Sequence, residues 1–551
     1  MLTLPISAPL LLAACTPEAP IASDYELTLV PSFLDSQLGL TEVSAEVKVR
    51  LVEPDAEPQI LYAGVAVAGE TLAIPELPPV PADTVVGLIF EAPGGSTDAW
   101  NRAATLAYGE ATVTEALATG GTAVELPIEV LRVDTVGRLG TLRGSERRQD
   151  GAVGLGPDGS LYVFGGGDPD SIRSFDVTGV GTVFITNSDA VTKFPKLDLG
   201  YGEPIGVATL PEFTAPLGQA GTPQTITDTA RASGVVTYVE SRDQSLLLVT
   251  GGRYSYAFSA YNIDQWVLFD PATDTIVDTG AFEIGRSSHL AIPVGNKVLL
   301  YGGLTGVGAG GIADYELWST VQRTSEYGHH QLDVASGSLN AMGTTLGEVG
   351  VVCGGLASDA SSDPDFYQWI PQVACHQFNA NDTIDDLAPL PIPLACGAIA
   401  PLPDGGLLVA GGITDTLADV GLTDVADAID RAFRWDPSTD AWTEVGSLAT
   451  ARAHHRMVPL DDGRVLVVGG MDQGTSLFGG IDGTVRCAEV FDPATDTFTE
   501  TTCSDAGQGQ DPRIGAWPGR GYAVLEGTAY SEGVVTSAGA TYGVVGGSPV
   551  E

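Results

Sequence analysis

The chain has 551 residues, of which 70 are glycine and 35 are proline, and 44% of its residues are hydrophobic. This composition is typical of a turn-rich all-β protein and excludes a chain that is disordered throughout. The 70 acidic residues outnumber the 25 basic ones and give a net charge of −45, which argues against nucleic acid as a partner. Binding of calcium to the acidic surface stays an alternative, although the sequence contains no D-x-D-x-D-G calcium loop.

A short apolar segment opens the chain and ends in Leu12-Ala13-Ala14-Cys15. This segment resembles the lipobox of bacterial lipoproteins, which implies that residues 1–15 are a signal peptide ending at the lipobox Cys15 and that this cysteine carries lipid. Residues 16–23 would then be a linker. The apolar run is too short to span a membrane. The alternative is an ordinary N-terminal tail in which the cysteine occurs by chance.

Residues 24–123 contain several short stretches in which apolar and polar residues alternate. From Thr41 to Leu51 the valines at 43, 47 and 49 alternate with charged or polar residues, which predicts a half-buried strand. Similar runs occur at Tyr25–Val30, Ile60–Val67, Val85–Phe90 and Ala104–Tyr108. Short strands at this spacing predict a small immunoglobulin-like β-sandwich over residues 24–123.

From residue 124 onward, a short apolar run that ends in two glycines recurs along the chain. Examples are LLLVTGG, VLLYGG and VLVVGG, and the glycine pairs lie at 165–166, 251–252, 302–303, 354–355, 411–412, 469–470 and 546–547. Internal repetition of this kind is typical of propellers and solenoids.

A second repeated element is the phrase FDPATDT, at Phe269–Thr275 and again at Phe491–Thr497, with the related WDPSTDA at Trp435–Ala441. The three starts lie 166 and 56 residues apart, so they fit one unit of about 55 residues. Proline presets φ and the aspartate can accept bonds from the amides that follow it. Each copy therefore predicts the tip of a β-hairpin.

The fullest unit reads ARAHHRMVPLDDGRVLVVGG, then a loop, then AEVFDPATDTFTE, between residues 451 and 500. It resembles the kelch repeat, in which each unit folds into a four-stranded propeller blade. The resemblance implies that the two glycines close the second strand and that the hairpin phrase joins the third and fourth strands. The fold class it implies is all-β, with a kelch-type β-propeller over residues 124–551 that follows the sandwich.

Seven glycine pairs predict seven blades. The pairs at 165 and 251 and those at 469 and 546 lie further apart than the others, so six or eight blades are also possible. The last pair lies four residues before the end of the sequence, so the last blade would lack two outer strands. DTVGRLGTLR at Asp134–Arg143 is similar to WTEVGSLATAR at Trp442–Arg452. We therefore expect residues 124–142 to supply the missing strands and to close the ring.

Five cysteines follow Cys15, so at least one of them should be free. Cys487 and Cys503 flank the last FDPATDT hairpin, where Cys487 would lie opposite residue 502 unless a β-bulge brings it to Cys503. We predict this disulfide, which suits an exported protein. Cys353 with Cys375 is the preferred second pair.

The loops between the second and third strands of each blade are long and should lie on one face of the propeller. Loops of this length are usually functional or disordered. Their aromatic residues suit a glycan or protein ligand, and the candidates are Tyr254, Tyr256, Tyr261, Tyr315, Phe366, Tyr367 and Trp369. The alternative is that these side chains pack the loops against the ring.

The kelch fold also includes galactose oxidase-like copper enzymes and sialic acid mutarotase-like proteins. His289 and His455 occupy equivalent repeat positions, which favours a structural role. No G-x-S-x-G, H-E-x-x-H or phosphate-loop motif is present. We assign no catalytic residue, metal or cofactor.

These features predict a non-catalytic binding protein that is exported and lipid-anchored in a bacterial envelope, at the outer membrane or the cell surface. Its partner would be a protein or glycan bound by the long-loop face. The alternatives are a carbohydrate-active enzyme of the oxidase or mutarotase type and a structural envelope protein. The sequence fixes neither the ligand nor the oligomeric state.

Overall fold

The computed structural model describes about two-thirds of the chain, and Cys15 lies outside the described residues. These are 25–33, 44–52, 59–67, 71–77, 85–91, 105–112, 124–132, 136–141, 151–166, 172–173, 183–184, 188–195, 205–219, 222–231, 234–256, 259–304, 314–328, 339–359, 368–418, 426–460, 463–476, 479–485, 487–503, 513–517, 521–525, 529–531, 534–536 and 540–544. The regular structure in them is β-strand, and no helix in these ranges is long and apolar enough to cross a membrane.

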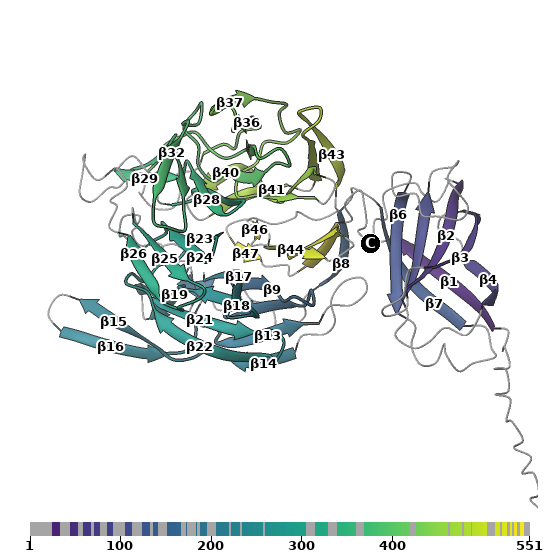
Figure 1. The fold of residues 1–551 in the computed structure, drawn as a ribbon, viewed down its shortest axis with the longest axis horizontal. Coiled ribbons are helices and arrows are strands. Elements are labelled where there is room, and N and C mark those ends of the chain that lie inside the picture. The colour runs from purple at the N-terminus through teal and green to yellow at the C-terminus, as the bar shows by residue number, and fades with distance from the viewer. Residues whose placement is uncertain are drawn as a thin grey trace, which may run out of the picture.

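The N-terminal part is one sheet of seven strands in the order β3-β2-β5-β6-β7-β1-β4 (Figure 1). Only β1 and β7 are parallel neighbours. Leu29, Val86, Leu88, Phe90 and Leu126 are buried in this sheet. The strands are β1 (Tyr25–Phe33), β2 (Ser44–Val52), β3 (Gln59–Val67), β4 (Leu72–Leu77), β5 (Val85–Glu91), β6 (Thr105–Thr112) and β7 (Val124–Arg132).

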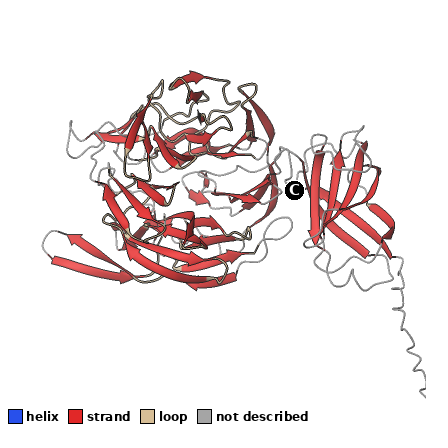
Figure 2. Ribbon diagram, in the orientation of Figure 1, coloured by secondary structure: helices blue, strands red, loops and turns tan. Residues whose placement is uncertain are grey.

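The remaining chain forms seven four-stranded antiparallel sheets in the described residues, here called blades 1 to 7 (Figure 2). Blade 1 is β9 (Ala152–Leu155), β10 (Leu161–Phe164), β13 (Ala190–Phe194) and β14 (Ile205–Thr209). Blade 2 is β17 (Val235–Ser241), β18 (Gln244–Thr250), β21 (Gln265–Asp270) and β22 (Thr275–Ala281). Blade 3 is β23 (Leu290–Val294), β24 (Lys297–Tyr301), β25 (Tyr315–Ser319) and β26 (Ser325–Gly328).

The other four blades follow the same order. Blade 4 is β27 (Met342–Leu346), β28 (Val349–Cys353), β31 (Cys375–Phe378) and β32 (Ile384–Leu387). Blade 5 is β33 (Ala398–Pro401), β34 (Leu407–Ala410), β36 (Ala432–Asp436) and β37 (Ala441–Glu444). Blade 6 is β38 (Arg456–Pro459), β39 (Val465–Val468), β42 (Cys487–Asp492) and β43 (Thr497–Cys503). Blade 7 is β44 (Arg513–Trp517), β45 (Gly521–Leu525), β48 (Ala540–Val544) and β8 (Val136–Thr141).

Successive blades bury their central strands against one another. Side chains of a strand alternate between its two faces, so Leu247 packs with Tyr162 and Phe164 of blade 1, while Leu246 packs with Trp318 of blade 3. Burying a leucine fully contributes roughly 1.5–3 kcal/mol, and each blade needs a neighbour on both sides to obtain it. Figure 1 shows the blades around a common centre, with the N-terminal sheet to one side.

The ring is closed by one strand from ahead of blade 1, not by two. β8 pairs with β48 in antiparallel register, and β9 of blade 1 contacts β44 of blade 7. The sequence-based expectation that residues 124–142 supply two strands is wrong for its first half, because 124–132 form β7 of the N-terminal sheet. The pair Gly546-Gly547 follows the third strand of blade 7, and the second strand is β45. The boundary between the two parts therefore lies after Arg132.

The glycine pairs of blades 1 to 6 mark the end of the second strand because the backbone there leaves no room for a side chain. Gly251 and Gly252 have φ of 57° and 111°. A Cβ on Gly251 would lie 2.2 Å from the carbonyl oxygen of Arg286, and one on Gly411 would lie 2.3 Å from that of Arg452. Glycine is thus required both by the left-handed conformation and by the close approach of the next linker.

Candidate functional site

The loops that join the second and third strands carry an additional tier of short strands on one face of the ring, here called the long-loop face. Blades 1, 2, 6 and 7 each carry a two-stranded hairpin, and blades 4 and 5 share a three-stranded sheet. The strands are β11 (Ile172–Arg173), β12 (Val183–Phe184), β19 (Arg253–Tyr256), β20 (Ser259–Asn262), β29 (Leu356–Asp359), β30 (Gln368–Pro371), β35 (Leu417–Ala418), β40 (Met471–Ser476), β41 (Gly479–Thr484), β46 (Ala529–Ser531) and β47 (Val534–Thr536). A further hairpin, β15 (Phe213–Gln219) with β16 (Thr222–Asp228), precedes blade 2.

Trp369 lies beneath the long-loop face instead of on it. It is opposite Leu417 in the shared sheet, and only 4% of its surface is exposed. It packs in an apolar cluster with Leu356, Ile413 and Ala453. Pairing of loops from blades 4 and 5 creates this cluster, so the expectation that Trp369 contacts a ligand is replaced by a packing role.

Tyr315 is a second candidate residue that the structure buries. It packs in the core between blades 3 and 4 against Phe378, with ring centroids 5.2 Å apart. Its hydroxyl donates to Oδ1 of Asp382 at 2.8 Å. Burial, followed by this bond to a carboxylate, raises the pKa of Tyr315 well above its usual value. The residue therefore joins two blades and is not available to a ligand.

The blade 2 hairpin holds the remaining described candidates. Tyr254 is half-buried and packs edge-on against Phe213, with ring centroids 5.8 Å apart. Tyr254 and Tyr261 are directly opposite each other in the β19–β20 register, and Tyr256 is on the same hairpin. Phe366 and Tyr367 lie outside the described residues. Three of the seven predicted residues thus share one hairpin.

The three copies of the turn phrase, on the opposite face of the ring, fasten blades 2, 5 and 6 to the blade before each of them. The last aspartate of the first copy, Asp274, has φ of 55° and accepts a bond from the hydroxyl of Tyr162 in blade 1 at 2.8 Å. Lys193 of blade 1 also approaches Asp274, at 3.2 Å. Burial and then the bond to Asp274 raise the pKa of Tyr162 above its usual value. The sequence predicted the turn but not this contact.

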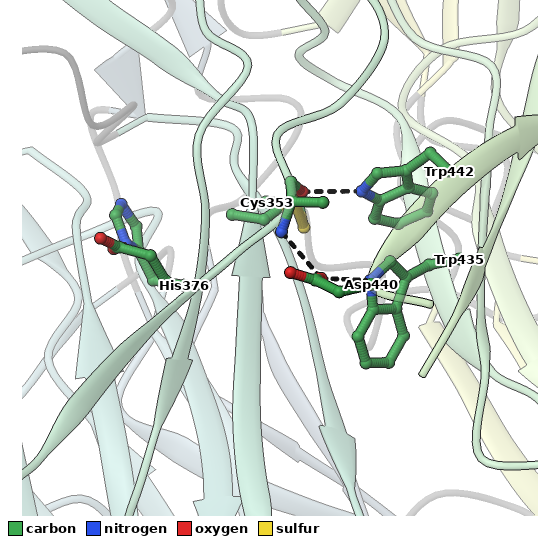
Figure 3. Close-up of a disulfide and its surroundings, with 8 residues drawn as sticks. Cys353, His376, Trp435, Asp440 and Trp442 are labelled. Atoms are coloured by element: carbon green, nitrogen blue, oxygen red, sulfur yellow. Dashed lines mark hydrogen bonds and ion pairs between the residues drawn. A yellow bond between two sulfur atoms is a disulfide. The ribbon is translucent and has the colours of Figure 1, made fainter. Parts of the chain in front are cut away.

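Other blades use the same position with different partners. Asp496 accepts from Arg434 of blade 5, and Asp440 accepts from the amide of Ala388 in blade 4 at 3.0 Å. Asp440 also accepts from the indole of Trp435 at 2.9 Å (Figure 3). These donors, the Ala388 amide first, hold the pKa of Asp440 below its usual value.

A buried ion pair lies at two junctions, on the long-loop side. Arg286, in the linker before blade 3, donates to Oε1 of Glu316 at 3.1 Å, and Arg452, before blade 6, donates to Oε1 of Glu489 at 2.6 Å. All four side chains are 0% exposed. Each glutamate also accepts bonds from two backbone amides, in the Glu489 case from residues 449 and 450. The pairs join the linker to the third strand of the next blade.

His289 follows Arg286 and is structural, as its recurrence with His455 predicted. Its Nε2 lies 2.8 Å from Oγ1 of Thr250, and the side chain is 5% exposed. Burial, and then the positive charge of Arg286, lower the pKa of His289 from 6.5 to about 3. The imidazole is therefore neutral at ordinary pH.

The structure shows the state of four of the five cysteines that follow Cys15 and allows a search for metal-binding groups. Cys353 and Cys375 are opposite each other in blade 4 and form a disulfide, which Figure 3 shows. Cys487 is disulfide-bonded, and a bulge places Cys503 opposite it across the hairpin. Cys396 is free and buried. In the described ranges, no group of three or more His, Cys, Asp or Glu side chains is arranged to hold a metal ion.

No protein-family model matches this chain. An F-box/kelch-repeat protein of Arabidopsis thaliana is 33% identical over 105 residues, which are 19% of this chain and 19% of that protein. The chain thus spans about a fifth of the length of this relative. The solved structure of YjhT aligns with 66% of this chain and 99% of its own, with 12% identity and a TM-score of 0.41. The local similarity and the repeated four-stranded antiparallel sheets are consistent with kelch propeller blades, as the sequence predicted.

Proposed function

We propose that this chain is a non-catalytic binding protein that recognises a protein or glycan with the long-loop face of its propeller. The observation that carries the proposal is the additional tier of hairpins and of the shared β29–β30–β35 sheet on that face. Binding residues are commonly held on loops that a rigid scaffold positions, and here the scaffold is the ring of blades. The net charge of −45 disfavours nucleic acid as the partner.

The binding surface that we favour is the β19–β20 hairpin of blade 2. Tyr254, Tyr256 and Tyr261 belong to this hairpin, and Tyr254 is held from one side by Phe213. A tyrosine combines an apolar ring with a polar tip, which suits both sugar rings and protein surfaces. The β15–β16 hairpin begins at Phe213 and contacts β20, so it would border the same surface.

The proposal includes a location in a bacterial envelope, at the outer membrane or the cell surface. The lipobox-like segment that ends at Cys15 supports export and lipid anchoring, and disulfide bonding of Cys353, Cys375 and Cys487 suits an oxidising compartment. The N-terminal strands would form an immunoglobulin-like sandwich between the anchor and the propeller. Mass spectrometry of the protein from bacterial membranes should show a lipid on Cys15, and Cys15→Ser should release the protein.

Binding is tested with a glycan array and a pull-down from cell-surface extracts, using purified full-length protein. Changing Tyr256 and Tyr261 together to alanine should weaken retention of the identified ligand at least about tenfold, a loss of about 1.4 kcal/mol. Tyr238→Ala is the matched control, because Tyr238 is a 44% exposed tyrosine midway along β17. Retention that is equal in all three proteins would contradict the assignment of blade 2 as the binding surface.

A further inference from the structure

Two positions decide whether the buried ion pair forms at a junction, and they can be compared at four junctions in the described residues. The linker position is the residue whose carbonyl accepts from the second glycine of the preceding blade, and it is occupied by Arg231, Arg286, Leu394 and Arg452. The strand position is the third-strand residue opposite the one two places before the glycine pair, and it is occupied by Val267, Glu316, Phe433 and Glu489. The junctions before blades 3 and 6 have both charges, and the junction before blade 5 has neither. The junction before blade 2 has only the arginine.

Arg231 is buried with much of its hydrogen-bonding capacity unused. The side chain is 1% exposed. Its Nη2 donates to the side-chain oxygen of Gln265 and to the carbonyl of Pro211 at 3.3 Å, and its guanidinium lies 5.3 Å from the ring centre of Phe213. Within the ranges that the structure describes, Nε and Nη1 have no hydrogen-bond partner. These two nitrogens carry most of the N–H groups of a guanidinium.

The missing element at this junction is a negative charge. In the described part of the chain, no carboxylate forms an ion pair with Arg231, and Val267 stands where the two complete junctions have a glutamate. Burial lowers the pKa of Arg231 to about 10, so the group is still charged at neutral pH. An unpaired buried charge is costly unless another group neutralises it.

We propose that a small monovalent anion, a halide or a small carboxylate, binds between blades 1 and 2 and accepts hydrogen bonds from Nε and Nη1 of Arg231. The anion takes the role that Glu316 and Glu489 have at the complete junctions. Valine has no carboxylate, so the third strand of blade 2 offers no negative charge at this position. The site is structural and is independent of ligand binding by the long-loop face.

The first test is thermal unfolding of the full chain in sodium formate, acetate and pivalate. Ionic strength and pH are kept constant, because a protein with a net charge of −45 responds to ionic strength itself. At saturating concentration, formate should raise the Tm of the propeller by about 2 °C over pivalate, which is too bulky to share the small site. Equal Tm values in the three salts would overturn the proposal.

Val267→Glu provides a second test, because it supplies the carboxylate from within the chain. This variant should have a higher Tm than the parent and should lose the difference between formate and pivalate. Phe433→Glu is the matched control, since it places the same side chain at the junction that has Leu394, and its Tm should fall. A formate effect of unchanged size in Val267→Glu would contradict the proposed site.

Crystals soaked in sodium bromide locate the anion without any variant. Anomalous scattering at the bromine edge should show a peak within hydrogen-bond distance of Nε or Nη1 of Arg231. No such peak should occur at Arg286 or Arg452, where a glutamate already pairs with the guanidinium. A map without the Arg231 peak would overturn the proposal even if Val267→Glu failed to fold.

Discussion

The junction before blade 6 and the junction before blade 5 solve the same structural problem with opposite chemistry. In both, the second glycine of the preceding blade donates to the linker carbonyl, at 2.8 Å for Arg452 and 2.9 Å for Leu394. The side chains differ completely, because Arg452 pairs with Glu489 whereas Leu394 is accompanied by Phe433. The backbone contact therefore defines the repeat, and the two positions can hold either a buried ion pair or two buried apolar side chains.

The linker position and the strand position of a junction must change together. A buried pair of charges and a pair of apolar side chains are each self-consistent, whereas one charge alone is not. The junction before blade 2, with Arg231 and Val267, is the exception among the described junctions. This is why the proposed anion site falls there.

The largest effect is expected from breaking the ion pair before blade 6. Glu489→Gln keeps the shape of the side chain but leaves Arg452 as an unpaired charge, so the free energy of unfolding should fall by about 3–5 kcal/mol. The measurement is denaturant unfolding of the full chain. The double variant Arg452→Leu/Glu489→Phe copies the junction before blade 5 and should lose less than the single variant. A double variant that is less stable than Glu489→Gln would show that the two solutions are not interchangeable.

A smaller effect is expected from acid at His289, beside the Arg286 junction. The folded pKa is about 3 and the usual value is 6.5, so between these values the unfolded chain binds a proton that the folded protein does not. Stability should fall as pH falls below 6.5, by about 1.4 kcal/mol per pH unit from this group. His289→Gln should lose about 2 kcal/mol less than the parent between pH 6.5 and 5. The measurement is denaturant unfolding of both proteins at a series of pH values. An equal loss of stability in the parent and in His289→Gln would show that His289 does not cause the pH dependence.

The smallest effects are expected at the turn face. Tyr162→Phe and Tyr315→Phe each remove one hydroxyl that bonds an aspartate of the next blade, and each should reduce the free energy of unfolding by about 1 kcal/mol. Arg431→Gln is the control, since it breaks an exposed ion pair with Glu444 within one blade and should leave stability unchanged. A larger loss in the control than in the tyrosine variants would remove the distinction between contacts that join blades and contacts within one.

Much of the fold could be predicted because its signals are local. The turn phrases and glycine pairs each depend on a few neighbouring residues whose backbone angles are special, such as Gly251 and Asp274. The pairing of Cys353 with Cys375 was favoured from the sequence, and the structure joins these two residues. The arginines at 286 and 452 were also visible as repeats, but their glutamates occur at unequal spacing. Their pairing therefore required the strand register.

The rest depends on contacts between distant parts of the chain. Trp369 is buried because its loop pairs with Leu417 of the next blade, a contact that no local pattern indicates. Residues 124–132 alternate as a strand should, but alternation does not say which sheet the strand joins, and β7 pairs with β1 and β6. The sequence therefore predicted too many ligand contacts among the aromatic candidates. It also predicted two closing strands where the structure has one.

The closure of the ring is tested most directly by a cross-link between β8 and β48. Residues 136 and 544 are directly opposite each other in this antiparallel pair. Opposed residues have Cβ atoms about 4.5–5.5 Å apart, which is within reach of a disulfide. In Val136→Cys/Val544→Cys, peptide mapping by mass spectrometry should find these two cysteines joined in the folded monomer. Two free thiols at these positions under oxidising conditions would contradict the closed ring.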